Sequence, residues 1–272
     1  MEAIKSLKHL YFILKTNKKE LDEVLGNLNK YYRPYCKPKR KKDGNLKMKN
    51  GKVETREICP STGVLKEIQK RIKTRILKKF EFQDYIQGGV KGKDNISNAK
   101  IHQGNKYFFT TDLRNFFPSV KYNDVYEMFI CNGFSADVSS ILTKLTTYKY
   151  SVPQGIPTST YITNLVAIPL DKELIDIGKC NGIKYTRYVD DLSFSSRKDF
   201  RNLIPQIINT IDANKLKISY RKTKYKIGPT EITGIEVRNN LIKPSIDVRN
   251  KFEKAEDEKT KSSLRIYMER IK

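Results

Sequence analysis

Hydrophobic side chains recur at helical spacing in several segments of the chain. In the segment 64–77, for example, Leu65, Ile68 and Ile72 fall on one face, which is typical of a helix that packs against a core. The same spacing predicts helices over residues 4–14, 21–32, 98–102, 123–131, 136–147 and 200–214. A further helix is expected to begin at Pro157 and to run to Leu174, and weaker periodicity predicts helix within 247–272.

Shorter apolar runs, bounded by turn residues, predict strands. An aromatic strand over 107–112 ends at Asp112, and runs at 182–188 and 192–196 flank Tyr188-Val189-Asp190-Asp191. This pattern predicts a tight hairpin with two adjacent carboxylates at its tip. Residues 232–237 predict one further strand, followed by a turn at Asn239-Asn240. Helices and strands mixed in this order, without an internal repeat, favour an α+β fold in which helices back an antiparallel sheet.

A basic segment near the N-terminus combines positive charge with two turn signals. Residues 37–52 hold eight Lys or Arg and the single acid Asp43. Because Asp43-Gly44 and Asn50-Gly51 favour tight turns, a basic, flexible β-hairpin is expected here. The segment is either a loop whose lysines are simply solvated or a finger whose lysines contact phosphates.

Two later segments have distinctive compositions. Residues 215–226 hold six basic residues and no acid, interleaved with Tyr220 and Tyr225. Such tyrosines either stack on bases or are ordinary strand residues. The glycine-rich segment 88–92 is too irregular for a phosphate-binding loop, so it is expected to be a mobile connection.

The composition fits a globular protein with an anionic partner. The chain has 272 residues, 38% of them apolar, which is enough for one large domain or two to three subdomains. Lysine and arginine number 54 against 30 aspartate and glutamate; the net charge of +24 favours nucleic acid, although a purely structural basic protein would share it. No apolar run approaches the ~20 residues of a membrane-spanning helix. Since the apolar stretch 10–14 is too short for a secretory signal, a cytoplasmic protein is expected.

The potential metal ligands of the chain are oxygens rather than thiols or imidazoles. Its four cysteines are scattered and its only histidines are His9 and His102, which disfavours zinc. An isolated Asp-Asp pair is usually a solvated turn. Here Asp112 precedes Asp190 by 78 residues and ends another predicted strand. Three carboxylates converging from separate strands would suit a pair of hard divalent cations, and Mg²⁺ fits.

Together these motifs resemble those of reverse transcriptases, and among them most the bacterial retron reverse transcriptases. The likeness covers roughly residues 56–237 and rests on Asp112-Leu113-Arg114-Asn115-Phe116-Phe117-Pro118-Ser119, Pro153-Gln154-Gly155 and Tyr188-Val189-Asp190-Asp191. The narrower likeness rests on Asn98-Ala99 with His102 and on Ile232-Thr233-Gly234. The chain departs from the retron pattern at Val189, where Ala is usual, and at Ile232, where Val is usual. Only 38 residues follow Gly234, which is short for the family's helical thumb.

The resemblance implies a right-hand polymerase and a division of the chain into its parts. Fingers are expected over 1–106, together with 121–152. An antiparallel-sheet palm is expected from 107–120 and 153–238, and a short helical thumb from 239–272. The activity implied is RNA-directed DNA polymerisation, a nucleotidyl transfer supported by two Mg²⁺ ions.

The resemblance also implies roles for individual residues. Asp112, Asp190 and Asp191, with the backbone carbonyl of Leu113, would hold the two Mg²⁺ ions. Lys222 would protonate the pyrophosphate. The nucleotide would be bound by Arg56 as a triphosphate clamp, by Phe117 as a ring that excludes a ribose 2′-hydroxyl, and by Gln154 and Gly155 as the pocket floor. The neighbouring Phe116 is expected to pack in the core.

The implied partners are a structured noncoding RNA that serves as template and primer, dNTPs, an RNA–DNA hybrid product and a defence effector protein, with no membrane. Retron enzymes begin synthesis at an internal 2′-hydroxyl and leave a branched RNA–DNA molecule used in phage defence. The candidate RNA-binding residues are Lys39, Arg40, Lys41, Lys42, Asn98, His102, Arg221 and Lys224, of which Asn98 and His102 are interpreted as structural or RNA-positioning. The alternatives are another defence-associated or group II intron-like bacterial reverse transcriptase, and a catalytically silent RNA-binding protein on a polymerase fold.

Overall fold

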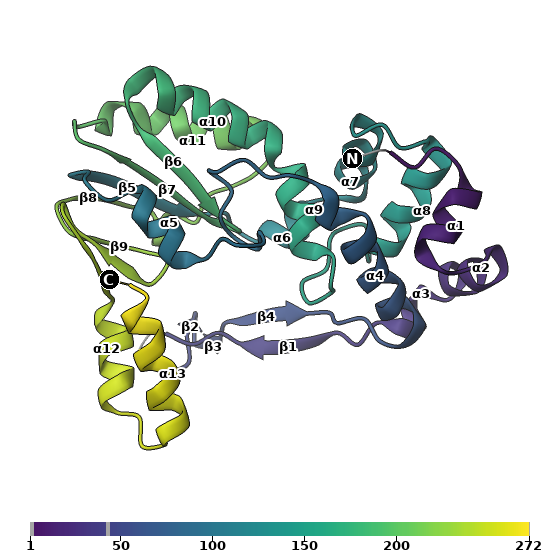
Figure 1. Cartoon of the computed structure of the whole chain (residues 1–272), viewed down its shortest axis with the longest axis horizontal. Helices are drawn as coiled ribbons and strands as arrows, with labels where there is room; N and C mark the ends of the chain where they lie inside the picture. The colour runs from purple at the N-terminus through teal and green to yellow at the C-terminus, as the bar shows by residue number, and fades with distance from the viewer. Residues whose placement is uncertain (1–2, 42–43, 272) are drawn as a thin grey trace. The chain divides into compact units, whose positions relative to one another are not determined.

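The structure, a computed structural model, describes residues 3–41 and 44–271 (Figure 1). The chain divides into two compact units, each assembled from two separate stretches of sequence. Unit 1 comprises Met1–Glu81 and Asn115–Val166, and unit 2 comprises Phe82–Arg114 and Ala167–Lys272. The finer division into fingers, palm and thumb stays a prediction. Within the described ranges, no helix combines the length and the apolar character that crossing a bilayer requires.

The body of unit 1 is helical. Its elements are α1 (Leu7–Leu14), α2 (Lys18–Gly26), α3 (Leu28–Tyr31), α4 (Gly63–Arg75), η1 (Leu77–Lys79), α6 (Phe116–Ser119), α7 (Tyr122–Cys131), α8 (Ala136–Thr146) and α9 (Ser159–Val166). The predicted apolar face of α4 is confirmed, since Leu65, Ile68 and Ile72 are fully buried and α4 packs against α1 and α8. The single helix expected over 21–32 is wrong, because the chain leaves helical geometry at Asn27, between α2 and α3.

A β-ribbon extends from the helical body of unit 1 (Figure 1). Strand β1 (Tyr35–Pro38) pairs antiparallel with β4 (Thr55–Ile58), and β2 (Met48–Lys49) pairs with β3 (Lys52–Val53). Asn50 and Gly51 join β2 to β3 with φ values of 49° and 73°, the left-handed geometry that an Asn-Gly turn supplies. The basic hairpin predicted from the sequence is therefore confirmed. Its first turn signal includes Asp43, which lies outside the described residues.

The main sheet of unit 2 has four antiparallel strands in the order β6-β7-β5-β8. These are β5 (Tyr107–Asp112), β6 (Lys184–Tyr188), β7 (Asp191–Ser196) and β8 (Lys224–Ile227). Helix α10 (Ile168–Asn181) packs on β6 and against α11 (Ile204–Ala213), which follows the short η2 (Arg201–Leu203); α5 (Asn95–Ile101) also contacts β6. Phe194 of β7 lies between Phe109 and Tyr185, with ring centroids at 5.7 and 4.8 Å. The helix-backed antiparallel sheet predicted from the sequence is confirmed.

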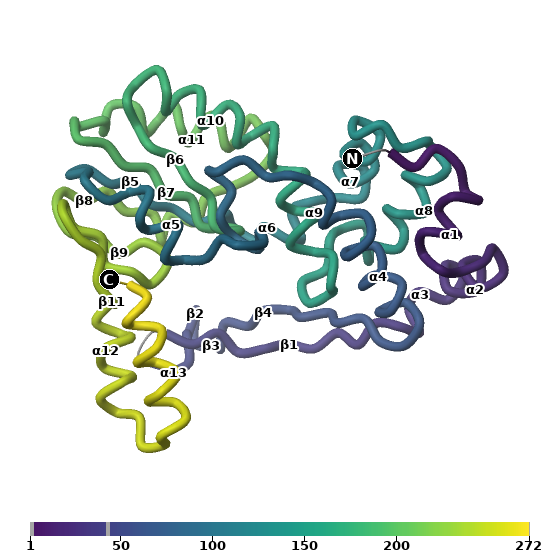
Figure 2. Tube along the Cα trace, in the orientation of Figure 1, coloured from purple at the N-terminus to yellow at the C-terminus, as the bar shows by residue number. Residues whose placement is uncertain are grey.

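A smaller three-stranded sheet completes unit 2. It consists of β9 (Thr230–Ile232), β10 (Ile235–Val237) and β11 (Ile242–Pro244). The single strand expected over 232–237 is wrong, because Thr233 and Gly234 turn the chain with φ values of 46° and 84°. This sheet shares an apolar core with α5, and the chain ends in α12 (Ile246–Glu253) and α13 (Glu258–Glu269), which run down and back in Figure 2.

The helix expected from Pro157 to Leu174 is also wrong as one element. The structure has α9 ending at Val166 and α10 beginning at Ile168, with Ala167 as the N-cap. Pro169 lies in the first turn of α10, where its missing N–H costs nothing. The same proline in a continuous helix would remove a backbone hydrogen bond and clash with the preceding turn, so the chain breaks instead.

Candidate active site

The register of the main sheet brings the three predicted carboxylates to one end of unit 2. Asp112, the last residue of β5, is the Cα partner of Asp191, the first residue of β7. The N–H of Leu113 donates to the carbonyl oxygen of Asp190 at 2.8 Å. Backbone pairing alone therefore holds Asp112, Asp190 and Asp191 side by side, although Asp112 is distant in sequence.

A strained turn carries the two adjacent acids. Tyr188 pairs with Asp191, which leaves Val189 and Asp190 as the two loop residues of the β6–β7 hairpin. Val189 has φ = 61°, a left-handed conformation that a β-branched residue rarely adopts. Such strain persists only where surrounding contacts fix the backbone. Two sets of contacts do so here.

The first contact set is a buried ion pair beneath the turn. Arg187 of β6 donates from Nε and Nη2 to the two carboxylate oxygens of Asp171 on α10, at 2.8 and 2.6 Å. Its Nη1 donates to the Val189 carbonyl at 3.1 Å, and the Tyr185 hydroxyl donates to Asp171 at 2.7 Å. Burial lowers the pKa of Arg187, but the Asp171 carboxylate outweighs it and raises that pKa above its usual value. The guanidinium therefore stays charged and ties α10 to the turn.

Arg187 and Asp171 were not among the functional residues predicted from the sequence. Both side chains are fully buried, which is rare for charged residues unless they are paired. A signal was present, since Arg187 falls on the same strand face as Tyr185, and Asp171 stands between Leu170 and Leu174 on a helix with few charges on that face. A single sequence does not show which buried acidic residue pairs with which buried basic residue.

The second contact set is the loop that contains Gly88. Ile86 forms a parallel bridge with Arg187, and the N–H groups of Gln87 and Gly88 both reach the Arg187 carbonyl. A Cβ on Gly88 would lie 2.3 Å from the Val189 nitrogen. The expectation that 88–92 is only a mobile connection is thus wrong for Gly88, whose lack of a side chain lets the loop lie against the turn.

The acidic cluster is electrostatically unfavourable without a cation. Burial first, and then the neighbouring Asp190 and Asp112, raise the pKa of Asp191 to about 7, against the opposing effect of Lys222. The Lys222 ammonium lies 2.5 Å from Oδ2 of Asp112. Lys222 is on η3 (Tyr220–Lys222), which Ser219 fastens to β5 by donating its N–H to the Asp112 carbonyl at 2.7 Å. A lysine thus already supplies one positive charge to this cluster.

The donor set fits a divalent metal in its chemistry, because carboxylate oxygens are the ligands that hard cations take. As the side chains stand, no group of three His, Cys, Asp or Glu residues within the described ranges is close enough to hold a metal ion. The backbone places the three acids together, and Lys222 engages Asp112. The convergence of all three carboxylates on metal ions therefore stays a prediction.

The predicted nucleotide-binding residues lie in unit 1. The Cys59 N–H, one residue after β4, donates to the Gln154 carbonyl at 2.7 Å, so Gln154 and Gly155 lie against the strand that carries Arg56. Gly155 has φ = 115°, and a Cβ there would meet the Ile58 side chain at 2.9 Å, so this position requires glycine. Arg56 is exposed on β4. The structure thus brings Gln154 and Gly155 against the strand that carries Arg56.

Phe117, the fourth, is half-buried on α6. Its neighbour Phe116 is 2% exposed, which confirms the core-packing interpretation of that ring. Whether Phe117 meets a nucleotide sugar stays a prediction.

Asn98 and His102 are buried, so neither side chain is exposed at the surface of the protein. His102 is fully buried, with Nδ1 2.7 Å from the Ser195 hydroxyl and Nε2 2.7 Å from the Thr186 hydroxyl. Burial, and to a lesser extent Lys184, lowers the pKa of His102 to about 3, so the imidazole is neutral. Asn98 donates from Nδ2 to the Thr233 hydroxyl at 3.2 Å. The two segments that carry the narrower resemblance therefore pack against each other, which agrees with the structural interpretation of these residues.

The remaining candidate RNA contacts are at the surface where the structure describes them. Arg40, Lys41, Arg221 and Lys224 are exposed, Lys39 is half-exposed, and Lys42 lies outside the described residues. Tyr220 is 72% exposed and available for stacking. Tyr225 instead donates its hydroxyl to Asp199 at 2.6 Å and packs edge-on against Phe200, so it is a packing residue.

An antiparallel sheet with acids at the adjoining ends of two neighbouring strands is the arrangement expected of a polymerase-type nucleotidyltransferase. Residues 39–237 match the family model described as "Reverse transcriptase (RNA-dependent DNA polymerase)". The chain belongs to the reverse transcriptase family, whose members generally use divalent metal ions.

Its curated relatives include retron enzymes. The chain is 30% identical over 252 residues to the Retron Se72 reverse transcriptase of Salmonella heidelberg (strain 579083-10), covering 88% of this chain and 64% of that protein. It is 31% identical over 191 residues to the Retron Ec86 reverse transcriptase of Escherichia coli, covering 67% of this chain and 60% of that protein. The chain thus spans about three fifths of the length of these relatives. Within the family it is retron-like.

A solved structure shows the same fold at low sequence identity. The apo telomerase of Candida tropicalis, truncated from its C-terminal domain, matches with a TM-score of 0.53 at 12% identity, covering 83% of this chain and 59% of that one. The predicted fold class, α+β of the right-hand polymerase type, is confirmed.

Proposed function

We propose that this chain is an RNA-directed DNA polymerase of the retron type. It copies a structured noncoding RNA that serves as both template and primer, and its product is a branched RNA–DNA hybrid that acts in phage defence, together with an effector protein. The observation that carries the proposal is the pairing of Asp112 with Asp191 beside Asp190, in a chain whose curated relatives are retron enzymes. The cytoplasmic location expected from the sequence stays a prediction.

Asp112, Asp190 and Asp191, with the Leu113 carbonyl, are the residues that would hold two Mg²⁺ ions. Two ions held there would supply a lowered pKa at the primer hydroxyl and charge neutralisation at the triphosphate. The raised pKa of Asp191 supports this assignment, because three acids held together at this end of the sheet need compensating charge. Lys222 provides part of that charge beside Asp112, and in the reaction it would protonate the pyrophosphate.

The residues of unit 1 supply nucleotide recognition in this proposal. Arg56 clamps the triphosphate through its guanidinium, and Gln154 and Gly155 form the floor of the pocket. Phe117 lies beneath the sugar and excludes a 2′-hydroxyl. The template RNA is held by the exposed basic residues Lys39, Arg40, Lys41, Arg221 and Lys224, and by Lys42.

Two other functions are compatible with the sequence motifs. Another defence-associated or group II intron-like reverse transcriptase would share the site but not the retron relatives. A catalytically silent RNA-binding protein would have no reason to keep three acids together at an energetic cost. A retron polymerase therefore accounts both for the similarity to retron enzymes and for the energetic cost of holding three acids together.

The polymerase assignment is tested by DNA synthesis on co-purifying RNA with Mg²⁺ and dNTPs. The double variant Asp190→Asn, Asp191→Asn should lose synthesis by about 100-fold or more, because charge stabilisation supplies much of the rate. Its RNA should still co-purify. The matched control is Asp176→Asn, an exposed acid on α10 of the same unit, which should polymerise normally. Equal synthesis by the double variant would refute the site.

The sugar-selection role of Phe117 has its own test. Phe117→Val should raise the incorporation of ribonucleotides relative to deoxynucleotides by on the order of 10-fold, since a smaller side chain admits the 2′-hydroxyl. Incorporation of each nucleotide by the purified protein is the measurement. Phe12→Val, at an exposed ring on α1, is the control. Unchanged sugar selectivity in the Phe117 variant would remove the gate from the mechanism.

A further inference from the structure

A tight turn between α8 and Pro153 has residues that its backbone disfavours. The N–H of Tyr148 donates to the Ser151 carbonyl at 2.8 Å, and the N–H of Ser151 donates back at 3.1 Å. Lys149 and Tyr150 between them have φ values of 47° and 62°. Two successive residues in the left-handed region are the mark of a type I′ turn, which favours Asn-Gly.

The other turns with two successive left-handed residues, within the ranges 3–41 and 44–271, use glycine. Asn50-Gly51 and Thr233-Gly234 each place glycine second, as the geometry prefers. A residue with a side chain costs roughly 1–2 kcal/mol in this conformation. Tyr150 is 84% exposed, so packing within the protein does not repay that cost. Strain of this kind at an exposed position points to a function for the side chains.

The backbone around the turn is firmly held within unit 1. Tyr122, the first residue of α7, donates its N–H to the Tyr150 carbonyl at 3.0 Å, and Val152 donates to Val120 at 3.0 Å. The Tyr148 ring stacks on Tyr32 with centroids 4.1 Å apart. The turn is therefore a fixed platform from which Lys149 and Tyr150 project.

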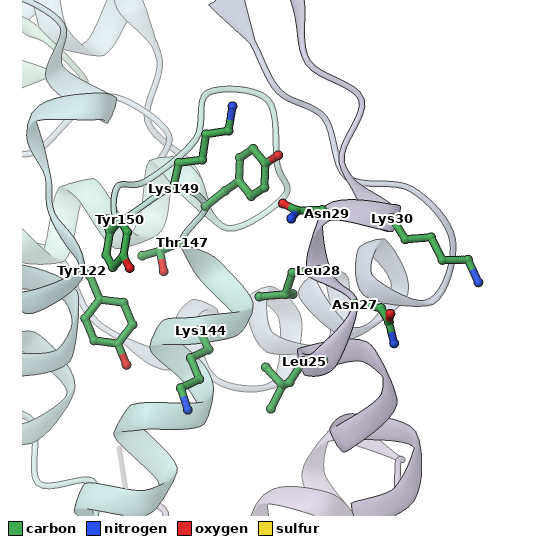
Figure 3. A pocket seen from close by; sticks show the side chains of 12 residues that line it. Leu25, Asn27, Leu28, Asn29, Lys30, Tyr122, Lys144, Thr147, Lys149 and Tyr150 are labelled. Atoms are coloured by element: carbon green, nitrogen blue, oxygen red, sulfur yellow. The ribbon is translucent and has the colours of Figure 1, made fainter.

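The turn borders a hollow of about 480 Å³, which is the size of a small-ligand site (Figure 3). Figure 3 shows Tyr122 and Tyr150 along one side, with Leu25 and Leu28 facing them from α2 and α3. Lys144 and Lys149 also line the hollow, and no acidic residue is among its lining residues. Aromatic rings, an apolar wall and lysines together suit a base with its phosphates.

We infer that this surface, here called the Tyr150 platform, binds an unpaired nucleic-acid strand. A base stacks on Tyr150 and enters the hollow, while Lys144 and Lys149 bind the adjoining phosphates. The inference rests on the proposed function for its partner and adds a contact site outside the predicted residues. RNA and DNA single strands share the required chemistry, and the test separates them.

The test uses a variant that improves the turn while it removes the contact. Lys149→Asn with Tyr150→Gly gives the turn its preferred residues, so the free energy of unfolding should be unchanged or higher. The affinity for a fluorescent 12-nucleotide unpaired RNA or DNA should fall by about 10-fold or more, as expected when a stacked base and a phosphate contact are lost. Tyr150→Phe keeps the ring and should bind like the parent.

Lys8→Gln with Phe12→Gln is the matched control, because it also removes one lysine and one exposed ring, from α1. It should leave binding within about 2-fold of the parent, since α1 contributes nothing to the platform. Weaker binding of either strand by the turn variant supports the platform and shows which strand it takes. Undiminished binding of both strands overturns it. Extension of a short annealed DNA primer on RNA by the parent protein reports the proposed function separately.

Discussion

His102 shows how a buried polar side chain is kept neutral in this protein. Both ring nitrogens have hydroxyl partners, Ser195 on β7 and Thr186 on β6. The ring therefore links the two strands that carry the acidic turn. A proton on the imidazole would place a charge in a site without a counter-charge among these partners, so the folded protein disfavours it.

This neutrality predicts a pH dependence of stability. Between pH 6.5 and about 3 the unfolded chain protonates His102 while the folded protein does not, so stability falls as the pH falls through this window. The loss between pH 7 and pH 5 should be about 2 kcal/mol. Chemical denaturation of the parent and of His102→Asn at both pH values measures it, and the difference between the proteins isolates this group.

The comparison with a variant is needed because Asp191 acts in the opposite direction. Its raised pKa means that stability falls as pH rises from about 4 towards 7. His9→Gln, at an exposed histidine outside this contact set, is the control for the loss of a histidine. A parallel pH dependence in the parent and in His102→Asn would show that His102 is not held neutral.

At the scale of elements, the β6–β7 hairpin depends on partners far away in sequence. Helix α10 supplies Asp171, and the 86–88 loop supplies the backbone that lies against Val189. The guanidinium of Arg187 then reaches the Val189 carbonyl. The strained turn is thus set by three elements together, which keeps the Asp190 and Asp191 backbone in one conformation.

The Arg187–Asp171 pair can be tested by separating stability from rate. Arg187→Met alone should cost about 3–5 kcal/mol, because it leaves Asp171 buried without its cation. The triple variant Arg187→Met, Asp171→Leu, Tyr185→Phe removes the whole polar set and should recover to within about 2 kcal/mol of the parent. DNA synthesis should nevertheless stay low, with kcat reduced and the KM for dNTP unchanged.

Stability recovers but kcat does not, because the triple variant still lacks the hydrogen-bond donor to the Val189 carbonyl. The KM for dNTP is unchanged because Arg187 positions the turn without contacting the nucleotide. Thermal unfolding and steady-state synthesis are the two measurements. Synthesis at the rate of the parent in a stable triple variant would mean that the ion pair contributes to folding alone.

At the scale of the whole molecule, the net positive charge favours a polyanionic binding partner. A net charge of +24 gives strong attraction to nucleic acid regardless of sequence, and the exposed basic residues lie in both units. Binding to phosphates releases counterions, so affinity falls as salt rises.

The salt dependence of RNA binding should reveal the hairpin contacts. Replacing Lys39, Arg40 and Lys41 by glutamine should reduce the slope of log affinity against log salt by about 2, since three phosphate contacts are lost. Filter binding or fluorescence anisotropy across salt concentrations gives this slope. Glutamine at Lys172, Lys179 and Lys198, three exposed lysines of unit 2, is the control of equal charge. Equal slopes for the two triple variants would show that the hairpin lysines contribute only their general charge.

Much of the fold was predictable from local patterns. The bounds of β5, the β6–β7 hairpin and the apolar face of α4 follow from the period of side chains that face a core. Local turn chemistry likewise predicted the Asn50-Gly51 turn. The predictions were wrong where one or two residues interrupt a periodic segment. Pro169 divides a predicted helix into two, and Thr233-Gly234 folds one apolar run into two strands.

By itself, the sequence determined most of the elements, the basic charge and the three acids at strand ends and in a hairpin turn, because each of these is a property of neighbouring residues. Tertiary structure alone decided that Asp112 lies opposite Asp191, that Arg187 meets Asp171, and that Gly88 lies against Val189. It also decided that His102 is buried, and it placed Lys149 and Tyr150 in a left-handed turn at the surface. These depend on contacts between residues far apart in the chain, and the energies of such contacts exist only once the elements are packed.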